Sequence, residues 1–166
     1  MSFLEKCVII KIIFYKRTIA GEKMLTIRYV TEADKPFWLS IDKHVTEAGF
    51  LQKVRGRFGY VIFRDQIPVG LFHYNVLWDM IPFLNLISII PEARGHGYGK
   101  RTMEYWETEM RRDGYQMVLV STQADEPAQQ FYRKLGYRDC GCLILDHCPF
   151  DQPAELFMRK NLVGSI

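Results

Sequence analysis

Cysteine is scarce in this chain, with four residues among 166, namely Cys7, Cys140, Cys142 and Cys148. A small secreted domain that depends on disulfides carries a denser and more regular set of cysteines. A chain of this length can also bury one sizeable core without covalent cross-links. The cysteine content therefore indicates one globular unit kept reduced in the cytoplasm.

Long apolar runs and strong net charge are also missing. The apolar stretch at residues 8–15 is interrupted by Lys11, whereas a membrane span needs about 20 apolar residues and a secretory signal needs an unbroken apolar core. The formal net charge is only +3, and the basic residues are scattered along the chain. We therefore expect neither a membrane nor a nucleic acid as a partner.

The start of the chain differs from the remainder. A strand and a helix start follow Met24 directly, so a domain begins naturally there. Residues 1–23 are interpreted as an N-terminal extension, which is an added strand, a flexible tail or the product of a start codon placed too far upstream. Residues 24–166 are expected to form a single domain.

Beyond Met24, β-rich runs alternate with amphipathic stretches, which predicts an α/β fold. Thr31 and Thr46 are placed to cap two early helices, the first with Asp34 three residues later. Trp106 lies at helical spacing from two methionines and is expected in the core. The expected strands are residues 25–30, both arms of a hairpin around 65–68, 83–90 as the central strand, 117–122, 138–145 and 154–161. A further helix is expected at residues 125–135.

A glycine-rich loop joins the central strand to the next helix. The segment IIPEARGHGYGKRT, residues 89–102, has glycine at positions 95, 97 and 99. Glycine inside a regular element costs about 0.5 to 1 kcal/mol relative to alanine, so a close approach of the backbone to a ligand is the expected reason. Free N–H groups at a helix N-terminus bind anions the size of a pyrophosphate. Three basic side chains add positive charge there, from Arg94, Lys100 and Arg101.

Two common phosphate-binding motifs do not fit this loop. The pattern GxxxxGK[ST] requires serine or threonine where Arg101 stands, and GxGxxG requires glycine where Lys100 stands. The pattern that remains is Arg94-x-x-Gly97-x-Gly99 at the start of a helix.

In this pattern the chain resembles the GCN5-related N-acetyltransferases, whose signature is [QR]-x-x-G-x-[GA] between a strand and a helix. A second similar segment is ADEPAQQFYRKLGYRD, residues 124–139, which carries Phe131 and Tyr132 and ends at Gly136 and Tyr137. The resemblance covers about residues 25–162. It implies a mixed central sheet of about six to seven strands flanked by helices on both faces, so that residues 24–166 would be one N-acetyltransferase domain.

The resemblance also implies a reaction and a set of binding residues. Acetyl-coenzyme A would donate its acetyl group directly to a primary amine of a small molecule or peptide, with no metal and no covalent enzyme intermediate. Ile89 and Ile90 would bind the pantetheine through main-chain groups. Asp125 and Tyr132 are also expected to bind the cofactor. Asp125 stands where the family often has asparagine, and it can still cap its helix, although its negative charge opposes the contact with the cofactor. The pyrophosphate would be held by Arg94 and by the amides of Gly95, His96, Gly97, Tyr98, Gly99 and Lys100.

Tyr132 is the expected general acid. Coenzyme A leaves as a thiolate, and a phenol with a reference pKa near 10 can give that sulfur a proton. The alternative is a packed aromatic side chain.

The general base is less clear. An alkyl amine with a reference pKa near 10.4 is mostly protonated at neutral pH, so a group must accept its proton. Many members of the family use a glutamate on the central strand, but FLNLISII contains no acid. The two acids to test are Asp79, before that strand, and Glu155, at the start of the last one. His73 is expected to be packed or exposed along the hairpin rather than to act as a base.

The segment DCGCLILDHCP contains Cys140, Cys142, His147 and Cys148, a conceivable set of zinc ligands. Zinc ribbons and fingers separate the first pair by two or more residues, so we expect no metal and partly buried, reduced thiols.

Two functions stay open. One is a cytoplasmic N-acetyltransferase, which Tyr132 favours, and the other is a non-catalytic coenzyme A-binding sensor or assembly module. The acceptor pocket is expected between residues 31–57 and the loops near Trp78 and Cys148, shaped by Trp78, Phe83 and Phe150. The oligomeric state is open as well, with a homodimer as the expectation.

Overall fold

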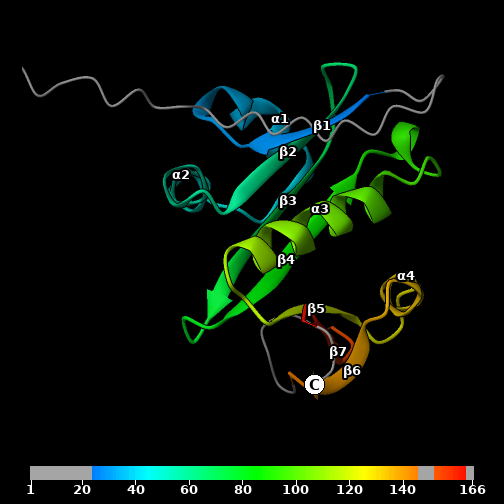
Figure 1. Ribbon diagram of the computed structural model, residues 1–166. Coiled ribbons are helices and arrows are strands. Elements are labelled where there is room, and N and C mark those ends of the chain that lie inside the picture. Colours follow the sequence, from blue (N-terminus) through cyan, green and yellow to red (C-terminus); the bar gives the residue numbers. More distant parts are fainter. Residues whose placement is uncertain (1–23, 146–151, 164–166) are drawn as a thin grey trace, which may run out of the picture.

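One mixed sheet organises the molecule in the computed structural model, which describes residues 24–145 and 152–163 (Figure 1). The strands are β1 (Leu25–Tyr29), β2 (Gly59–Arg64), β3 (Ile67–Leu77), β4 (Ile81–Ile89), β5 (Met117–Gln123), β6 (Arg138–Leu143) and β7 (Glu155–Asn161). The helices are η1 (Glu32–Asp34), α1 (Lys35–Ile41), α2 (Glu47–Gly56), η2 (Pro91–Ala93), α3 (Tyr98–Arg112) and α4 (Ala128–Lys134). The predicted α/β class and the predicted order of elements are confirmed.

The seven strands follow the order β1-β2-β3-β4-β5-β7-β6, so β4 is the central strand, as expected. Strands β4 and β5 are parallel, and every other neighbouring pair is antiparallel. The parallel pair requires a crossover connection, which α3 supplies. The start of α3 therefore lies at the carboxyl end of β4.

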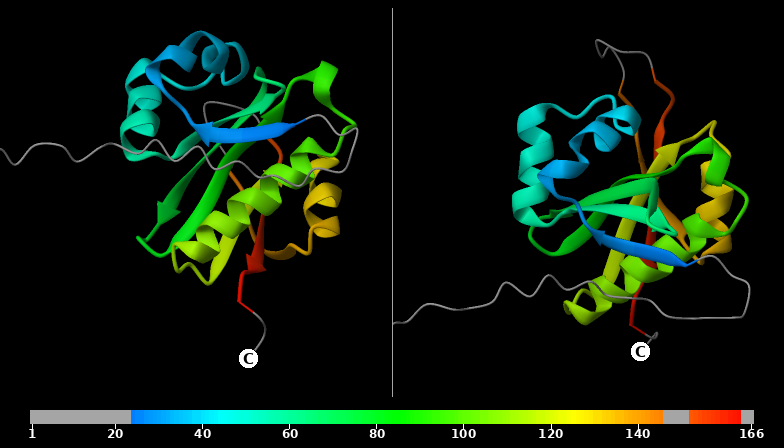
Figure 2. Two further views of the ribbon diagram at one scale, coloured as in Figure 1. Left: turned by 45° about the horizontal axis from the view of Figure 1, so that its top comes forward. Right: turned by 90° about the horizontal axis from the view of Figure 1, so that it is seen from above.

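Helices cover both faces of the sheet (Figure 2). On one face, Trp38 of α1 and Phe50 of α2 pack against Val61 and Leu71 of the sheet. On the other face, Trp106 belongs to a larger core and is completely buried, as its spacing predicted. This core also contains Met103 and Met110 of α3, Tyr132 of α4, and the strand residues Tyr60, Phe72, Leu84 and Val120.

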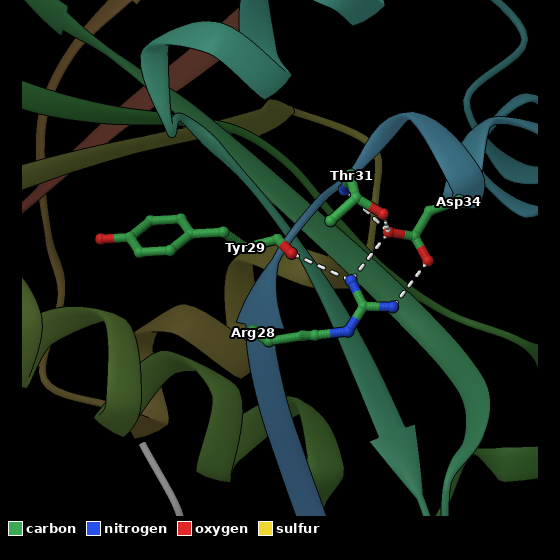
Figure 3. A network of polar contacts seen from close by, with 4 residues as sticks. All are labelled: Arg28, Tyr29, Thr31 and Asp34. Atoms are coloured by element: carbon green, nitrogen blue, oxygen red, sulfur yellow. Dashed lines mark hydrogen bonds and ion pairs between the residues drawn. The ribbon is translucent and has the colours of Figure 1, made fainter. Parts of the chain in front are cut away.

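A polar network fixes the chain between β1 and α1 (Figure 3). Both terminal nitrogens of Arg28 donate to Asp34, at 2.7 and 2.8 Å, and the N–H and hydroxyl of Thr31 donate to the same carboxylate. Partial burial alone would raise the pKa of Asp34, but the hydrogen bonds from Arg28 and Thr31 outweigh it and hold that pKa below its ordinary value. The predicted capping role of Thr31 and Asp34 is confirmed, and Thr46 caps α2 by accepting the N–H of Gly49.

The prediction for the helix after β5 is wrong at its start. Helix α4 begins at Ala128 with Pro127 at the N-cap, so Asp125 lies in the preceding loop and does not cap the helix. Proline suits a helix start because it lacks the N–H that would be unsatisfied there and fixes φ near −65°. The loop is held instead by Gln129, whose side-chain nitrogen donates to the carbonyl of Ala124 at 2.9 Å.

The cysteine prediction is also corrected in part. Cys140 and Cys142 are free thiols, but both are exposed rather than partly buried, because β6 is an edge strand with all six residues exposed. His147 and Cys148 lie outside the described residues. Among residues 24–145 and 152–163, no group of three or more histidine, cysteine or acidic side chains is placed to hold a metal. No helix within these ranges has the length and apolar character of a membrane span.

Candidate active site

The candidate site begins where β4 and β5 separate. The two strands pair only at Phe83 with Leu119 and at Leu84 with Val120, although β4 continues to Ile89. Asn85 is an extra residue in β4, because His73 pairs with Leu86 and Tyr74 pairs with Leu84. The β4 edge that faces β5 therefore has no strand partner among the described residues beyond Leu84. Main-chain groups on this edge are available to a bound molecule.

A cavity of about 530 Å³ opens beside this edge. Its walls come from the end of β4, the glycine-rich loop and α4. Its lining residues are Ile87, Ser88, Ile89, Ala93, Arg94, Gly95, Gly97, Tyr98, Gly99, Lys100, Ala128, Phe131 and Tyr132. Both sequence segments that carried the resemblance thus meet around one cavity.

The loop has the geometry of an anion site. Gly95 and Gly97 have φ values of 77° and 75°, a left-handed conformation that glycine adopts without strain. A Cβ atom at either position would meet nothing within 4 Å, so the backbone faces open space. The first hydrogen bond of α3 runs from the N–H of Arg101 to the carbonyl of Gly97. The N–H groups of residues 95–100 accordingly have no backbone acceptor in the described chain, and they lie at the positive end of the helix.

Three side chains of the loop take different positions relative to the cavity. Tyr98 is buried and lines the cavity. His96 is exposed and turns back onto its own loop, with its Nδ1 atom 2.8 Å from the carbonyl of Arg94. The guanidinium of Arg94 donates from Nε to the carbonyl of Ile89 at 2.9 Å, which fixes this cation at the end of β4.

The end of β4 offers fewer free groups than the sequence suggested. The N–H of Ile90 donates to the carbonyl of Val69, and the carbonyl of Ile90 accepts from Ala93. Ile90 therefore has no free N–H for a pantetheine. Ile89 lines the cavity, but its carbonyl already accepts the bond from Arg94.

Tyr132 lies in the wall of the cavity, with only 7% of its surface exposed. Its ring packs edge-on against Phe131 and Tyr137. Burial raises the pKa of Tyr132 to about 12, and the carboxylates of Glu126 and Glu155 add to this rise. The phenol is therefore fully protonated at neutral pH and able to donate.

The two acids predicted as bases have different positions. Glu155 is half-buried at the start of β7, opposite Gln123 of β5, and its charge acts on Tyr132. Asp79 occupies the β3–β4 hairpin turn with φ 57°, at the opposite end of β4 from the start of α3 (Figure 1). Residues 81–86 of β4 separate this turn from the cavity, whose lining on this strand begins at Ile87, a distance of about 20 Å at ~3.3 Å per residue. The structure does not bring Asp79 to the cavity, so Asp79 is not placed to act as a base.

Asp125, expected to bind the cofactor, and Trp78 and Phe83, expected around the acceptor, also lie away from this cavity. Asp125 is exposed in the loop before α4 and does not line the cavity. Trp78 is 75% exposed at the same hairpin as Asp79. Phe83 stacks on Phe157 at a centroid distance of 5.7 Å, and Phe150 lies outside the described residues. His73 is buried and packed, as expected.

Comparison with known proteins agrees with this geometry. Residues 24–137 match the model of the Acetyltransferase (GNAT) family. Because this match covers more than half of the chain, the protein belongs to that family of acetyltransferases. An uncharacterized acetyltransferase of Streptococcus pyogenes serotype M1 is 27% identical over 105 residues, which are 61% of this chain and 72% of the relative.

Solved structures share the fold at lower identity. The ribosomal-protein-S18-alanine N-acetyltransferase of Escherichia coli superimposes with a TM-score of 0.71 at 18% identity, over 86% of this chain and 96% of that one. The Salmonella typhimurium protein yncA, solved with its cofactor acetyl-CoA, gives a TM-score of 0.71 at 17% identity over the same shares. The resemblance predicted from the two sequence segments is therefore confirmed.

Proposed function

We propose that this protein is an acetyl-CoA-dependent N-acetyltransferase that transfers an acetyl group directly to a primary amine of a small molecule or peptide. The observation that carries the proposal is that the free amides of residues 95–100 and the protonated Tyr132 border the same cavity. An anion site alone would suit many ligands. An anion site beside a buried phenol and an open strand edge suits a thioester carried on a phosphorylated arm.

The residues present fit acetyl-CoA, which supplies the activated acetyl group. The amides of Gly95, His96, Gly97, Tyr98, Gly99 and Lys100 would hold its pyrophosphate, and the charge of Arg94 would add to the attraction. The open edge of β4, including Ile89, would hold the pantetheine by main-chain hydrogen bonds. Asp125 has no assigned role, because it lies outside the cavity lining.

The reaction requires two proton movements. The amine nitrogen forms a bond to the acetyl carbonyl carbon, the bond from that carbon to sulfur breaks, and the amine loses one proton. Tyr132 donates a proton to the departing sulfur. A phenol with a pKa of about 12 is a weak acid, but the same burial raises the proton affinity of the thiolate, so donation stays feasible. Glu155 is half-buried and its charge acts on Tyr132, so it remains the proposed base. It lines neither cavity, so it would accept the amine proton through water.

The alternative is a non-catalytic coenzyme A-binding module. Calorimetric titration with acetyl-CoA, followed by a thiol-release assay over a panel of amines, separates the two functions. Saturable binding with amine-dependent thiol release supports the transferase. Binding without any amine-dependent release supports the module, and an absence of binding contradicts both. The cytoplasmic location and the homodimer stay predictions from the sequence.

A further inference from the structure

A second cavity lies on the same central strand. Its volume is about 440 Å³, and its walls come from the end of α1, the loop to α2, α2 itself, β3 and β4. Asn85 and Leu86 line this cavity, whereas Ile87, Ser88 and Ile89 line the first. The two cavities lie on opposite faces of the sheet, because α1 and α2 cover one face and α3 and α4 the other. Both reach β4 beyond Leu84, where this strand has no partner on the side of β5 among the described residues. A group delivered along the first cavity would therefore reach a molecule in the second through this open edge.

A buried acid, Asp42, lines the second cavity. Asp42 is 8% exposed, and its Oδ2 atom lies 3.2 Å from Nε2 of His73, which is 7% exposed. Burial lowers the pKa of His73 to about 4, with a further contribution from the charge of Lys53 and opposition from Asp42. His73 is therefore neutral at pH 7, and it hydrogen-bonds Asp42 without cancelling its charge. Nδ1 of His73 is also buried and has no hydrogen-bond partner in the described chain.

The second cavity also contains a cation, the ammonium group of Lys53. Lys53 of α2 is half-buried and lines the cavity. No carboxylate of the described chain lies within 4 Å of its ammonium, and this holds for Asp42 as well. The charge of Lys53 nevertheless lowers the pKa of His73. The neighbouring lysine on α1 behaves differently, because Lys35 is paired with Glu47 outside the cavity. Lys53 and Asp42 are thus opposite charges in one cavity that do not contact each other.

The geometry points to an acceptor that carries both an amine and an acidic group, bound in this second cavity with its ammonium toward Asp42 and its carboxylate toward Lys53. Such a ligand would place an opposite charge beside each of the two residues. A plain alkyl amine or a peptide N-terminus provides the ammonium for Asp42 but no carboxylate for Lys53. The ammonium would then lie beside His73, which pairs with Leu86 on β4, the strand that also borders the cavity that we assign to acetyl-CoA. This inference rests on the proposed function for its chemistry, and the site itself rests only on the cavity.

The remaining lining favours a compact ligand. Ile41, Val45 and Leu86 provide apolar contacts, while Lys43 and His44 stand exposed at the rim. A volume of about 440 Å³ holds a molecule the size of an amino acid with some water. The class is therefore a small amino acid or a close analogue.

Common L-amino acids, each compared with its own primary amide, test this directly. The amide keeps the amine and the side chain but lacks the negative charge. An α-amine next to an amide has a lower pKa than one next to a carboxylate, so an enzyme with no recognition of the acid acetylates the amide faster. We expect the reverse for at least one pair, with kcat/KM about 10-fold or more in favour of the acid, the effect of one charged hydrogen bond.

Lys53→Met keeps most of the aliphatic stem and removes the charge. We expect it to abolish the preference for the acid while leaving kcat/KM for the amide within about 2-fold. Lys35→Met is the matched control, because it removes a lysine of the adjacent helix that does not line the cavity. It should leave the preference intact. Equal losses for the acid and the amide in Lys53→Met would overturn the inference.

A binding measurement separates this inference from the proposed function. Saturation-transfer NMR with the same amino acids and amides, without acetyl-CoA, reports binding independently of acetyl transfer, and the Lys53→Met variant assigns that binding to the second cavity. Binding of an amino acid that is lost in Lys53→Met supports the site even if no acetyl transfer occurs. Equal binding of acid and amide overturns it, as does acetylation confined to amines that lack an acidic group, and the transferase would stand in the second case.

Discussion

The two cavities on β4 differ in the kind of chemical group that lines them. The first is made largely of backbone, with free amides at the start of α3 and glycines that leave space for a ligand. The second is made of side chains, with Asp42, Lys53 and His73 brought together from the end of α1, from α2 and from β3. A backbone site suits a ligand common to a whole family, because few substitutions alter it. A side-chain site can change its ligand with single substitutions, so it suits the acceptor.

The largest effect is expected at the chemical step. Tyr132→Phe keeps the ring and its contacts but removes the hydroxyl, so the variant should fold and bind acetyl-CoA normally while the transfer rate falls by ~10² to 10⁴. Pre-steady-state acetyl transfer at saturating cofactor measures this rate.

Tyr137→Phe is the control, because the hydroxyl of Tyr137 donates to Glu107 at 3.0 Å and lies outside the cavity lining. It should cost stability and leave the transfer rate unchanged, and equal rates in all three proteins would remove Tyr132 as the acid.

The second cavity should give the protein a pH-dependent stability. His73 has a folded pKa of about 4, below its ordinary value of 6.5. Between these values the unfolded chain binds more protons, so the contribution of His73 is complete above pH 6.5 and decreases as pH falls toward 4. The loss is up to about 3 kcal/mol at ~1.36 kcal/mol per pKa unit. Urea unfolding from pH 7 to 4 measures it, and His73→Gln should lose less stability over that range. Parallel losses in both proteins would contradict the role given to His73.

The first cavity should lose affinity when its glycines gain side chains. Gly97→Val and Gly114→Val are a matched pair, because both glycines have positive φ and open space around the added Cβ. The left-handed backbone should cost each variant about 1 to 2 kcal/mol of stability. Only Gly97→Val should also weaken acetyl-CoA binding, by about 10-fold or more, since its side chain blocks amides of the loop. Calorimetric titration with acetyl-CoA measures the affinity of both variants. Unchanged affinity in folded Gly97→Val would refute the anion site.

The smallest effect concerns Arg94. Arg94→Ala removes an exposed cation at the cavity, so acetyl-CoA affinity should fall by only about 2- to 5-fold at low salt and by less at higher salt. Calorimetric titrations at two salt concentrations measure this difference. Arg55→Ala, an exposed arginine on α2 that lines neither cavity, should change nothing. A loss in Arg94→Ala that does not depend on salt would indicate a structural role through the bond to Ile89.

The sequence was informative wherever function depends on local backbone. The spacing of Arg94, Gly97 and Gly99 located the start of α3, because the free N–H groups of a helix start are fixed by nearby residues alone. The pattern around Phe131 and Tyr132 was equally local. The resemblance to the family rests on these two segments alone and does not depend on the contact between them.

The second cavity, which we propose for the acceptor, takes six of its lining residues from the expected range 31–57, but the sequence does not predict which of its charged side chains meet. Asp42, Lys53 and His73 meet only because α1 and α2 pack on the sheet through Trp38 and Phe50, and no short pattern records that packing. Asp79 precedes the central strand in the sequence, but the first cavity lies at the carboxyl end of that strand. Asp125 was expected at a helix cap that Pro127 occupies.

One single-turnover experiment tests the central claim most directly. Protein in excess over acetyl-CoA is mixed with the panel of amino acids and amides, and free thiol and acetylated amine are measured together. The account predicts that thiol and acetylated amine appear in equal amounts, at a rate that requires an amine and falls by ~10² or more in Tyr132→Phe. Saturable binding of acetyl-CoA with no release of thiol above the amine-free control would contradict it and would make the protein a coenzyme A-binding module.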